Sequence, residues 1–161
     1  MKLVCYRIDE TAQWKAFQSK MDILVNRMAE QAKCEPKHIW NQLDDMLSTP
    51  ERAVVALVVD IDATKLYGYV AFALEEWRGE RAVHIHWISM ARDLGGKEYL
   101  PCVFNFVNQY GWKWGCRYRT FKLTRLDLVM QKNDRVTRKL KHFDMKADLT
   151  YWGEMPQGGD D

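Results

Sequence analysis

The stretch AVHIHWISMARDLGGKEYLPCVFNFVNQY, residues 82–110, decides the fold. Apolar and polar side chains alternate over residues 82–90, which predicts a β-strand. Residues 92–97 form a loop with two glycines, after which apolar residues recur at helical spacing: Leu100, Val103, Phe104 and Val107. A strand, a loop and a helix start therefore follow in order. Free backbone N–H groups at a helix start favour a phosphate, so the loop is a candidate phosphate site, with an ordinary surface turn as the alternative.

Length and composition predict one globular domain. The chain has 161 residues, of which 47% are hydrophobic, enough for a core without disulfide staples. No apolar run reaches the length of about eighteen residues needed to span a membrane, and the first residues are too soon charged for a signal peptide. We therefore expect a cytoplasmic protein. The cysteines at 5, 34, 102 and 116 lack metal-site spacing, so we expect buried thiols and no metal.

Two helices are predicted between a first strand at residues 2–8 and the central strands. Asp9 or Thr11 caps the first helix, whose apolar positions are spaced by three and four residues. These positions are Trp14, Phe17, Met21, Leu24 and Met28. Pro36 starts the second helix, which ends before Pro50.

Three strands joined by short polar turns then predict an antiparallel meander, at residues 53–59, 66–77 and 82–90. A helix at 98–110 stops at Gly111. The remaining expected elements are a strand at 118–128, a helix at 134–143 and a strand at 147–152. The fold class is α/β (α+β), a mixed and mostly antiparallel sheet flanked by helices in the order β-α-α-β-β-β-α-β-α-β. One domain covers residues 1–154, and residues 155–161 are expected to be a disordered tail.

The glycine loop and the element order resemble those of the Gcn5-related N-acetyltransferases, the GNAT superfamily. Arg92-x-x-Gly95-Gly96-Lys97 is similar to the family's pyrophosphate loop, (Gln/Arg)-x-x-Gly-x-(Gly/Ala), with Lys97 in place of the last small residue. Residues 133–146 align without gaps on a second motif near the family's C-terminus, in which Asn133 is kept and Leu140 replaces a tyrosine. The likeness runs from residue 1 to about residue 154 and implies the GNAT fold.

The resemblance implies acetyl-CoA or another acyl-CoA as co-substrate, and it implies where this co-substrate binds. In the family, the strand before the loop bulges and diverges from the next strand, and the pantetheine arm bonds to backbone groups in the gap. The cofactor-binding residues implied here are Trp87, Ile88, Met90, Arg92, Leu94, Gly95, Gly96, Lys97 and Asn133. The family's tyrosine often returns a proton to the leaving thiolate, which Leu140 cannot do.

Candidate catalytic residues lie on the strands beside this gap. His84 and His86 point to the same side of one strand, and either imidazole is able to accept a proton from an amine. Glu75 and Glu76 on the neighbouring strand are alternative bases, and Glu76 joins the two histidines in the predicted set. Two structural histidines are the simpler interpretation of the pair. A His-x-His metal site would need a third ligand, and none has a helpful spacing.

The charge is unevenly distributed along the chain. The net charge is +2, yet residues 113–146 contain eleven Lys and Arg against three Asp. A solvated helix face is one explanation. A polyphosphate cofactor, nucleic acid or an acidic protein partner are the others.

The predicted function is transfer of an acyl group from acyl-CoA to an amine on a small molecule, a protein or a nucleic-acid base. A catalytically silent GNAT-like protein is the first alternative, with a binding or structural role such as a virion component or a host-interaction protein. The degenerate loop and Leu140 would suit such a divergent protein of a bacteriophage. A nucleic-acid binder that uses residues 113–146 is the second alternative. No membrane partner is expected.

Overall fold

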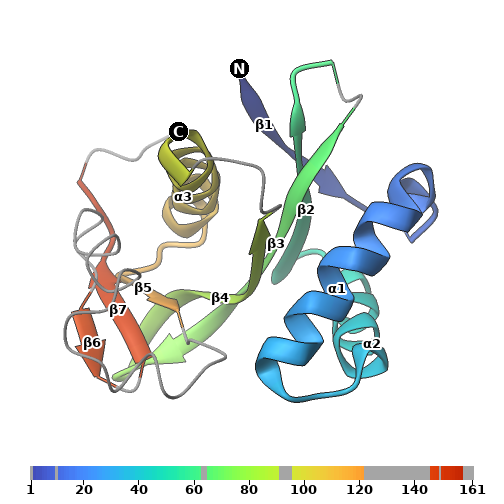
Figure 1. The fold of residues 1–161 in the computed structure, drawn as a ribbon. Helices are drawn as coiled ribbons and strands as arrows, with labels where there is room; N and C mark the ends of the chain where they lie inside the picture. The colour runs from blue at the N-terminus through green and yellow to red at the C-terminus, as the bar shows by residue number, and fades with distance from the viewer. Residues whose placement is uncertain are drawn as a thin grey trace.

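A computed structural model describes residues 2–9, 11–62, 65–90, 96–121, 146–148 and 150–157. A seven-stranded sheet in the order β1-β2-β3-β4-β5-β7-β6 forms the centre, and helices cover both of its faces (Figure 1). The strands are β1 (Leu3–Ile8), β2 (Ala53–Asp60), β3 (Leu66–Trp77), β4 (Glu80–Met90), β5 (Tyr118–Phe121), β6 (Lys146–Asp148) and β7 (Thr150–Glu154). The helices are η1 (Thr11–Phe17), which is a 3₁₀ helix, α1 (Gln18–Ala32), α2 (Pro36–Leu47) and α3 (Gly96–Lys113).

Two apolar cores fill the space between the sheet and its helices. Helices α1 and α2 pack on one face, whereas α3 packs on the other (Figure 1). Val55 and Leu57 of β2 belong to the first core, and Val54 and Ala56 belong to the second. Successive side chains of a strand point to opposite faces, so β2 is buried on both sides. Its nearly continuous β-branched sequence predicted this.

The strand pairing confirms the predicted meander and fold class. β1 pairs with β2, β2 with β3, and β3 with β4, all antiparallel. β4 and β5 are parallel, because α3 crosses over one face of the sheet between them. No helix among the described residues is long and apolar enough to span a membrane.

Two element predictions are wrong in detail. The first part of the expected first helix is η1, and α1 begins only at Gln18, without a side-chain cap. The end of the chain forms an antiparallel pair, β6 and β7, in place of the single strand expected at residues 147–152. The predicted helix at 134–143 and most of the predicted strand at 118–128 lie outside the described residues.

Helix α3 also runs past its predicted end at Gly111 and continues to Lys113. Gly111 is a close-packing position, since a Cβ there would lie 2.7 Å from the Met155 side chain. The backbone N–H of Met155 donates to the Arg117 carbonyl at 2.7 Å, and the Trp112 indole donates to the Pro156 carbonyl at 2.9 Å. The chain just after β7 is therefore attached to α3 and to the start of β5.

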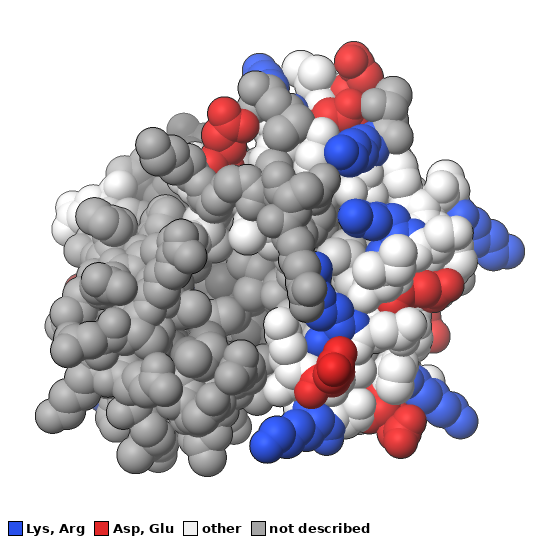
Figure 2. Space-filling view, in the orientation of Figure 1, with Lys and Arg blue, Asp and Glu red and all other residues white. Residues whose placement is uncertain are grey.

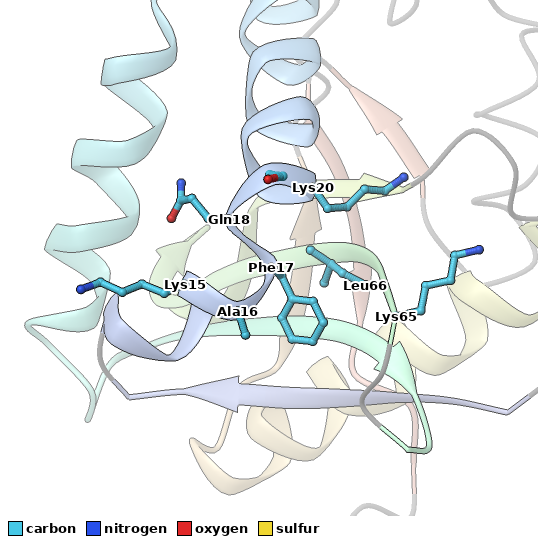
Figure 3. A pocket seen from close by; sticks show the side chains of 8 residues that line it. Lys15, Ala16, Phe17, Gln18, Lys20, Lys65 and Leu66 are labelled. Atoms are coloured by element: carbon cyan, nitrogen blue, oxygen red, sulfur yellow. The ribbon is translucent and has the colours of Figure 1, made fainter.

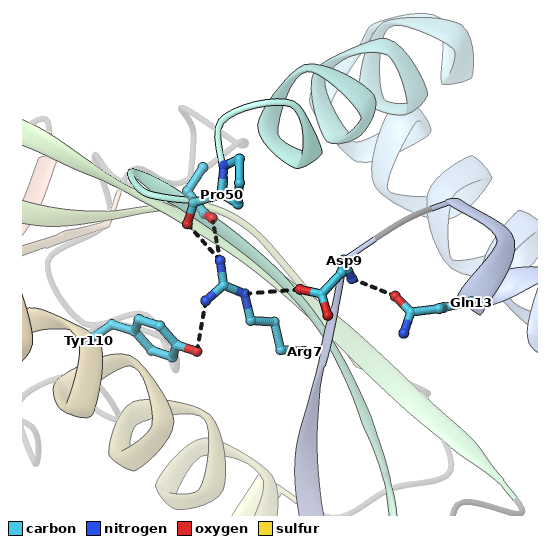
Figure 4. A network of polar contacts seen from close by, with 6 residues as sticks. Arg7, Asp9, Gln13, Pro50 and Tyr110 are labelled. Carbon is cyan, nitrogen blue, oxygen red and sulfur yellow. Dashed lines mark hydrogen bonds and ion pairs between the residues drawn. The ribbon is translucent and has the colours of Figure 1, made fainter.

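Arg7 of β1 connects three segments (Figure 4). Its guanidinium donates to the Pro50 carbonyl at 2.7 Å and to the Tyr110 hydroxyl at 3.2 Å. Asp9 forms an ion pair with the same side chain, with 3.8 Å between Nε and Oδ1. Arg7 thus joins the edge strand to the α2–β2 connection and to the last turns of α3.

Gly68 of β3 lies where the end of β4 meets the start of α3. A Cβ at this position would overlap the Ser89 carbonyl oxygen and the Tyr99 hydroxyl, which donates to that oxygen. Close-packed interiors do not absorb an added methyl group without shifts of their neighbours. Glycine is therefore required here for packing.

Gly68→Ala is expected to lower the free energy of unfolding by about 1–3 kcal/mol, the usual cost of overpacking a core. Urea denaturation measures this change. Gly79→Asn is the control, because Gly79 lies in the β3–β4 turn at φ +79° with no atom within 4 Å of an added Cβ, and asparagine tolerates this conformation. Equal losses in the two variants would contradict the packing argument.

Candidate active site

The described β5 runs beside only the first half of β4 (Figure 1). They pair from Ala82 with Tyr118 to Ile85 with Phe121, although β4 continues to Met90. On its other edge, β4 stays paired with β3 as far as Met90. Within the described part of the chain, no strand pairs with the β5-side edge of residues 86–90.

A β-bulge lies at His86, directly after Ile85, the last β4 residue that pairs with the described β5. Ala71 of β3 pairs with Trp87, and the next residue, Phe72, pairs with Ile85, so His86 is an extra residue. A bulge bends its strand and increases the local twist. It also puts the His86 and Trp87 side chains on the same face, where both contact Gln42 of α2. The bulge that the family resemblance implied is present.

The two predicted histidines lie together on the α2 face. Their ring centroids are 4.6 Å apart, with an angle of 89° between the ring planes. His86 Nε2 is 3.1 Å from Glu75 Oε1, and His84 Nδ1 is 2.5 Å from Thr120 Oγ1. Glu75 is therefore the carboxylate next to the pair. Alternation along β3 places the predicted base Glu76 on the α3 side of the sheet.

Gln42 completes this group, and the sequence analysis did not select it. Its Oε1 accepts a hydrogen bond from Trp87 Nε1 at 2.5 Å, and its Nε2 is 3.4 Å from His86 Nδ1. The sequence gives only a weak indication of this role for Gln42. Gln42 lies three residues after Ile39 and four before Met46, both buried, so a polar side chain interrupts the inner face of α2.

A hollow of about 350 Å³ opens beside His86 and Glu75. Its wall is formed by α2, by the connection from α2 to the start of β2, by the C-terminal part of β3 and by His86 of β4. The other polar residues that line it are Gln42, Asp45, Thr49 and Arg52. Ligand pockets usually measure about 300–1,000 Å³, so this hollow suits a small molecule or one side chain of a larger one.

Side chains from both faces fix the end of β4, where the predicted cofactor-binding residues Trp87, Ile88 and Met90 lie. Arg27 of α1 donates to the Met90 carbonyl, and Tyr99 of α3 donates to the Ser89 carbonyl. Burial raises the pKa of the Tyr99 hydroxyl well above its ordinary value, so Tyr99 remains a donor. The strand end is held in one position by these two contacts.

The remaining predicted cofactor-binding residues belong to the loop and to the C-terminal third. Gly96 and Lys97 are the first residues of α3. Arg92, Leu94, Gly95 and Asn133 lie outside the described residues, as does Leu140.

Two members of the basic stretch at 113–146, Arg117 and Arg119, contact the protein itself. The Arg117 guanidinium forms ion pairs with Glu80, at 3.5 Å between Nη1 and Oε1, and with Glu154, at 3.8 Å between Nη2 and Oε1. Arg119 is only 3% exposed and donates to Asn108 Oδ1 at 3.1 Å. On the described part of the face in Figure 2, basic and acidic side chains are interspersed. These observations do not define a basic binding surface.

A second hollow, of about 330 Å³, lies at the start of α1. Lys15, Lys20 and Lys65 surround its apolar floor of Phe17 and Leu66. In Figure 3, the Lys15 side chain extends to one side, and the Lys20 and Lys65 side chains extend to the other. The three charges therefore do not converge on one anion.

Comparison with solved structures identifies the fold. Glucosamine-6-phosphate N-acetyltransferase from Arabidopsis thaliana has a TM-score of 0.62 and 12% identity, over 92% of this chain and 94% of that chain. A GNAT-family acetyltransferase from Listeria monocytogenes 4b F2365 has a TM-score of 0.61 and 12% identity, over 93% and 94%. An N-acyl amino acid synthase from uncultured soil microbes has a TM-score of 0.61 and 11% identity, over 97% and 92%. No protein-family model and no curated protein sequence matches the chain. The chain therefore has the GNAT fold.

Two thiols form a close pair between β1 and α3. Cys5 Sγ and Cys102 Sγ are 3.8 Å apart. The hydrogen bond from Cys5 lowers the pKa of Cys102 to about 7, because it stabilises the thiolate. The same hydrogen bond, together with burial, raises the pKa of Cys5. Burial raises the pKa of Cys116 to about 11.

Iodoacetamide at pH 7.5 is expected to label Cys102 before Cys5 and Cys116, since the thiolate is the reactive form. The Cys102 rate should rise as the pH increases through 7. Cys5→Ala removes the hydrogen bond and should slow the labelling of Cys102, whereas Cys34→Ala should not. Peptide mass spectrometry over time measures each rate. First labelling at Cys116 would show that the thiol pair does not act as described.

Proposed function

We propose that the protein is an acyl-CoA-dependent N-acyltransferase that transfers an acyl group, such as acetyl, to an amine. The observation that supports this most is the bulge at His86, after which no described strand covers the β5-side edge of β4. A free edge of N–H and C=O groups is able to bind an extended amide chain as a further strand would. The pantetheine arm of CoA is a chain of this kind.

We infer from the position of this edge which residues would hold acyl-CoA. Backbone groups of Trp87, Ile88 and Met90 would bond to the pantetheine amides. The first turn of α3, which begins at Gly96, is the positive end of the helix dipole and would favour the pyrophosphate. Arg92, Leu94, Gly95, Lys97 and Asn133 are proposed to complete this end of the site. A thioester bound here would place its acyl group near the bulge.

The acid–base chemistry is proposed to take place at the bulge. An ammonium ion must lose a proton before its nitrogen attacks a thioester carbonyl. His84, His86 and Glu75 lie together on the α2 face, beside a hollow that admits a small acceptor. Glu76, which was also proposed from the sequence, would act only on an acceptor that reaches the α3 face.

Two alternative functions would give different experimental results from acyl transfer. A silent GNAT-fold protein with a structural or host-interaction role, as in a phage, would not turn over acyl-CoA. A nucleic-acid binder would use the basic residues of 113–146, among which Arg117 and Arg119 also contact the protein itself. No observation among the described residues favours either alternative over acyl transfer.

Isothermal titration calorimetry with acetyl-CoA tests the proposal. The parent protein should bind at a single site, and the double variant Gly95→Asp/Gly96→Asp should bind at least about tenfold more weakly, because two carboxylates would repel the pyrophosphate. Gly79→Asp is the matched control, since it adds a carboxylate at a remote glycine turn. Absence of binding by the parent, or equal affinity in the double variant, would refute the cofactor site.

A further inference from the structure

Four side chains beside the bulge form one hydrogen-bonded series. Trp87 Nε1 is 2.5 Å from Gln42 Oε1, and Gln42 Nε2 is 3.4 Å from His86 Nδ1. His86 Nε2 is in turn 3.1 Å from Glu75 Oε1. The series begins at Trp87, which is buried, and ends at Glu75, whose side chain is 45% exposed. It therefore runs from the core of the α2 face to the hollow.

Trp87 fixes the direction of the whole series, because an indole nitrogen only donates. Gln42 must accept with Oε1, and its amide nitrogen, which also only donates, then faces His86. His86 Nδ1 must accept, so the neutral imidazole has its proton on Nε2 and donates it to Glu75. In this tautomer Nδ1 is the only ring nitrogen that can accept a proton, and it already accepts a hydrogen bond from Gln42.

The neighbouring imidazole does not change this assignment. His84 lies edge-on to His86, with 4.6 Å between ring centroids, and its Nδ1 is hydrogen-bonded to Thr120. His86 Nδ1 thus contacts Gln42, and His86 Nε2 contacts Glu75. Both ring nitrogens of His86 are therefore hydrogen-bonded, which suits a residue that orients its neighbour Glu75.

We propose that Gln42 is a positioning residue that holds His86 in the Nε2–H tautomer, and that Glu75, rather than His86, accepts the proton of the acceptor amine. The second part rests on the proposed function. Glu75 lines the hollow, where an ammonium ion would approach it. The ammonium gives one proton to the carboxylate, which leaves a neutral amine and a carboxylic acid. The acid returns its proton to water through the open hollow.

Nitrogen-15 NMR of the imidazole side chains tests the tautomer without any substrate. The parent protein at a pH where His86 is neutral should have the His86 proton on Nε2 only. Gln42→Glu keeps an acceptor for Trp87 but puts a carboxylate oxygen opposite Nδ1, so His86 should gain a proton on Nδ1. Asn41→Asp adds the same charge one residue away on α2 and should leave the His86 signals unchanged. A parent His86 protonated on Nδ1, or no change in Gln42→Glu, would overturn the role of Gln42.

Kinetics with acetyl-CoA and benzylamine, 1,4-diaminobutane or lysine as probe amines test the assignment to Glu75. Glu75→Gln should lower kcat by about 10²–10⁴-fold, the usual contribution of acid–base catalysis, with the KM for acetyl-CoA unchanged. His86→Gln keeps an N–H donor where Nε2 was and should cost less. An equal or larger loss in His86→Gln would make His86 the base. If the parent acetylates none of these amines, the proposed function fails for them, and the NMR result still decides the role of Gln42.

Discussion

His86 is inserted between two residues of β4 that pair with consecutive residues of β3, and the geometry of the site follows from this shift. Before the shift, β4 is paired on both edges. After it, β3 is the one described strand that pairs with β4. The same insertion puts His86 and Trp87 on one face, so both side chains reach Gln42. One extra residue therefore creates the polar group proposed for acid–base chemistry, directly before the backbone edge proposed for acyl-CoA.

A backbone edge is best prepared for a ligand when the strand end is held in place. Arg27 and Tyr99 donate to consecutive carbonyls at the end of β4, from opposite faces of the sheet. Gly68 allows this arrangement, because any Cβ there would overlap the Tyr99 hydroxyl and its acceptor. The end of β4 is thus fixed by α1, α3 and β3 together. A preorganised edge needs little rearrangement when a ligand binds.

The sequence predicted the layers of the fold better than the details of the site. Residues 53–59 are almost continuously apolar, and that pattern identifies a strand covered on both faces. The choice between Glu75 and Glu76 depends on which face of β3 meets α2, and alternation alone does not say which. The bulge at His86 adds one residue without any glycine or proline to mark it. Gln42 is one polar residue in an amphipathic helix, and its role arises only from contact with residues more than forty positions away.

The central claim is that acyl-CoA binds along the edge of β4 beyond the bulge. Backbone amide NMR during titration with acetyl-CoA tests this claim most directly. The account predicts that the amide signals of residues 86–90 and of the first turn of α3 shift together and saturate, while those of β1 and the first half of β2 do not. Shifts confined to η1 and the start of α1, or no shifts at all, would contradict it.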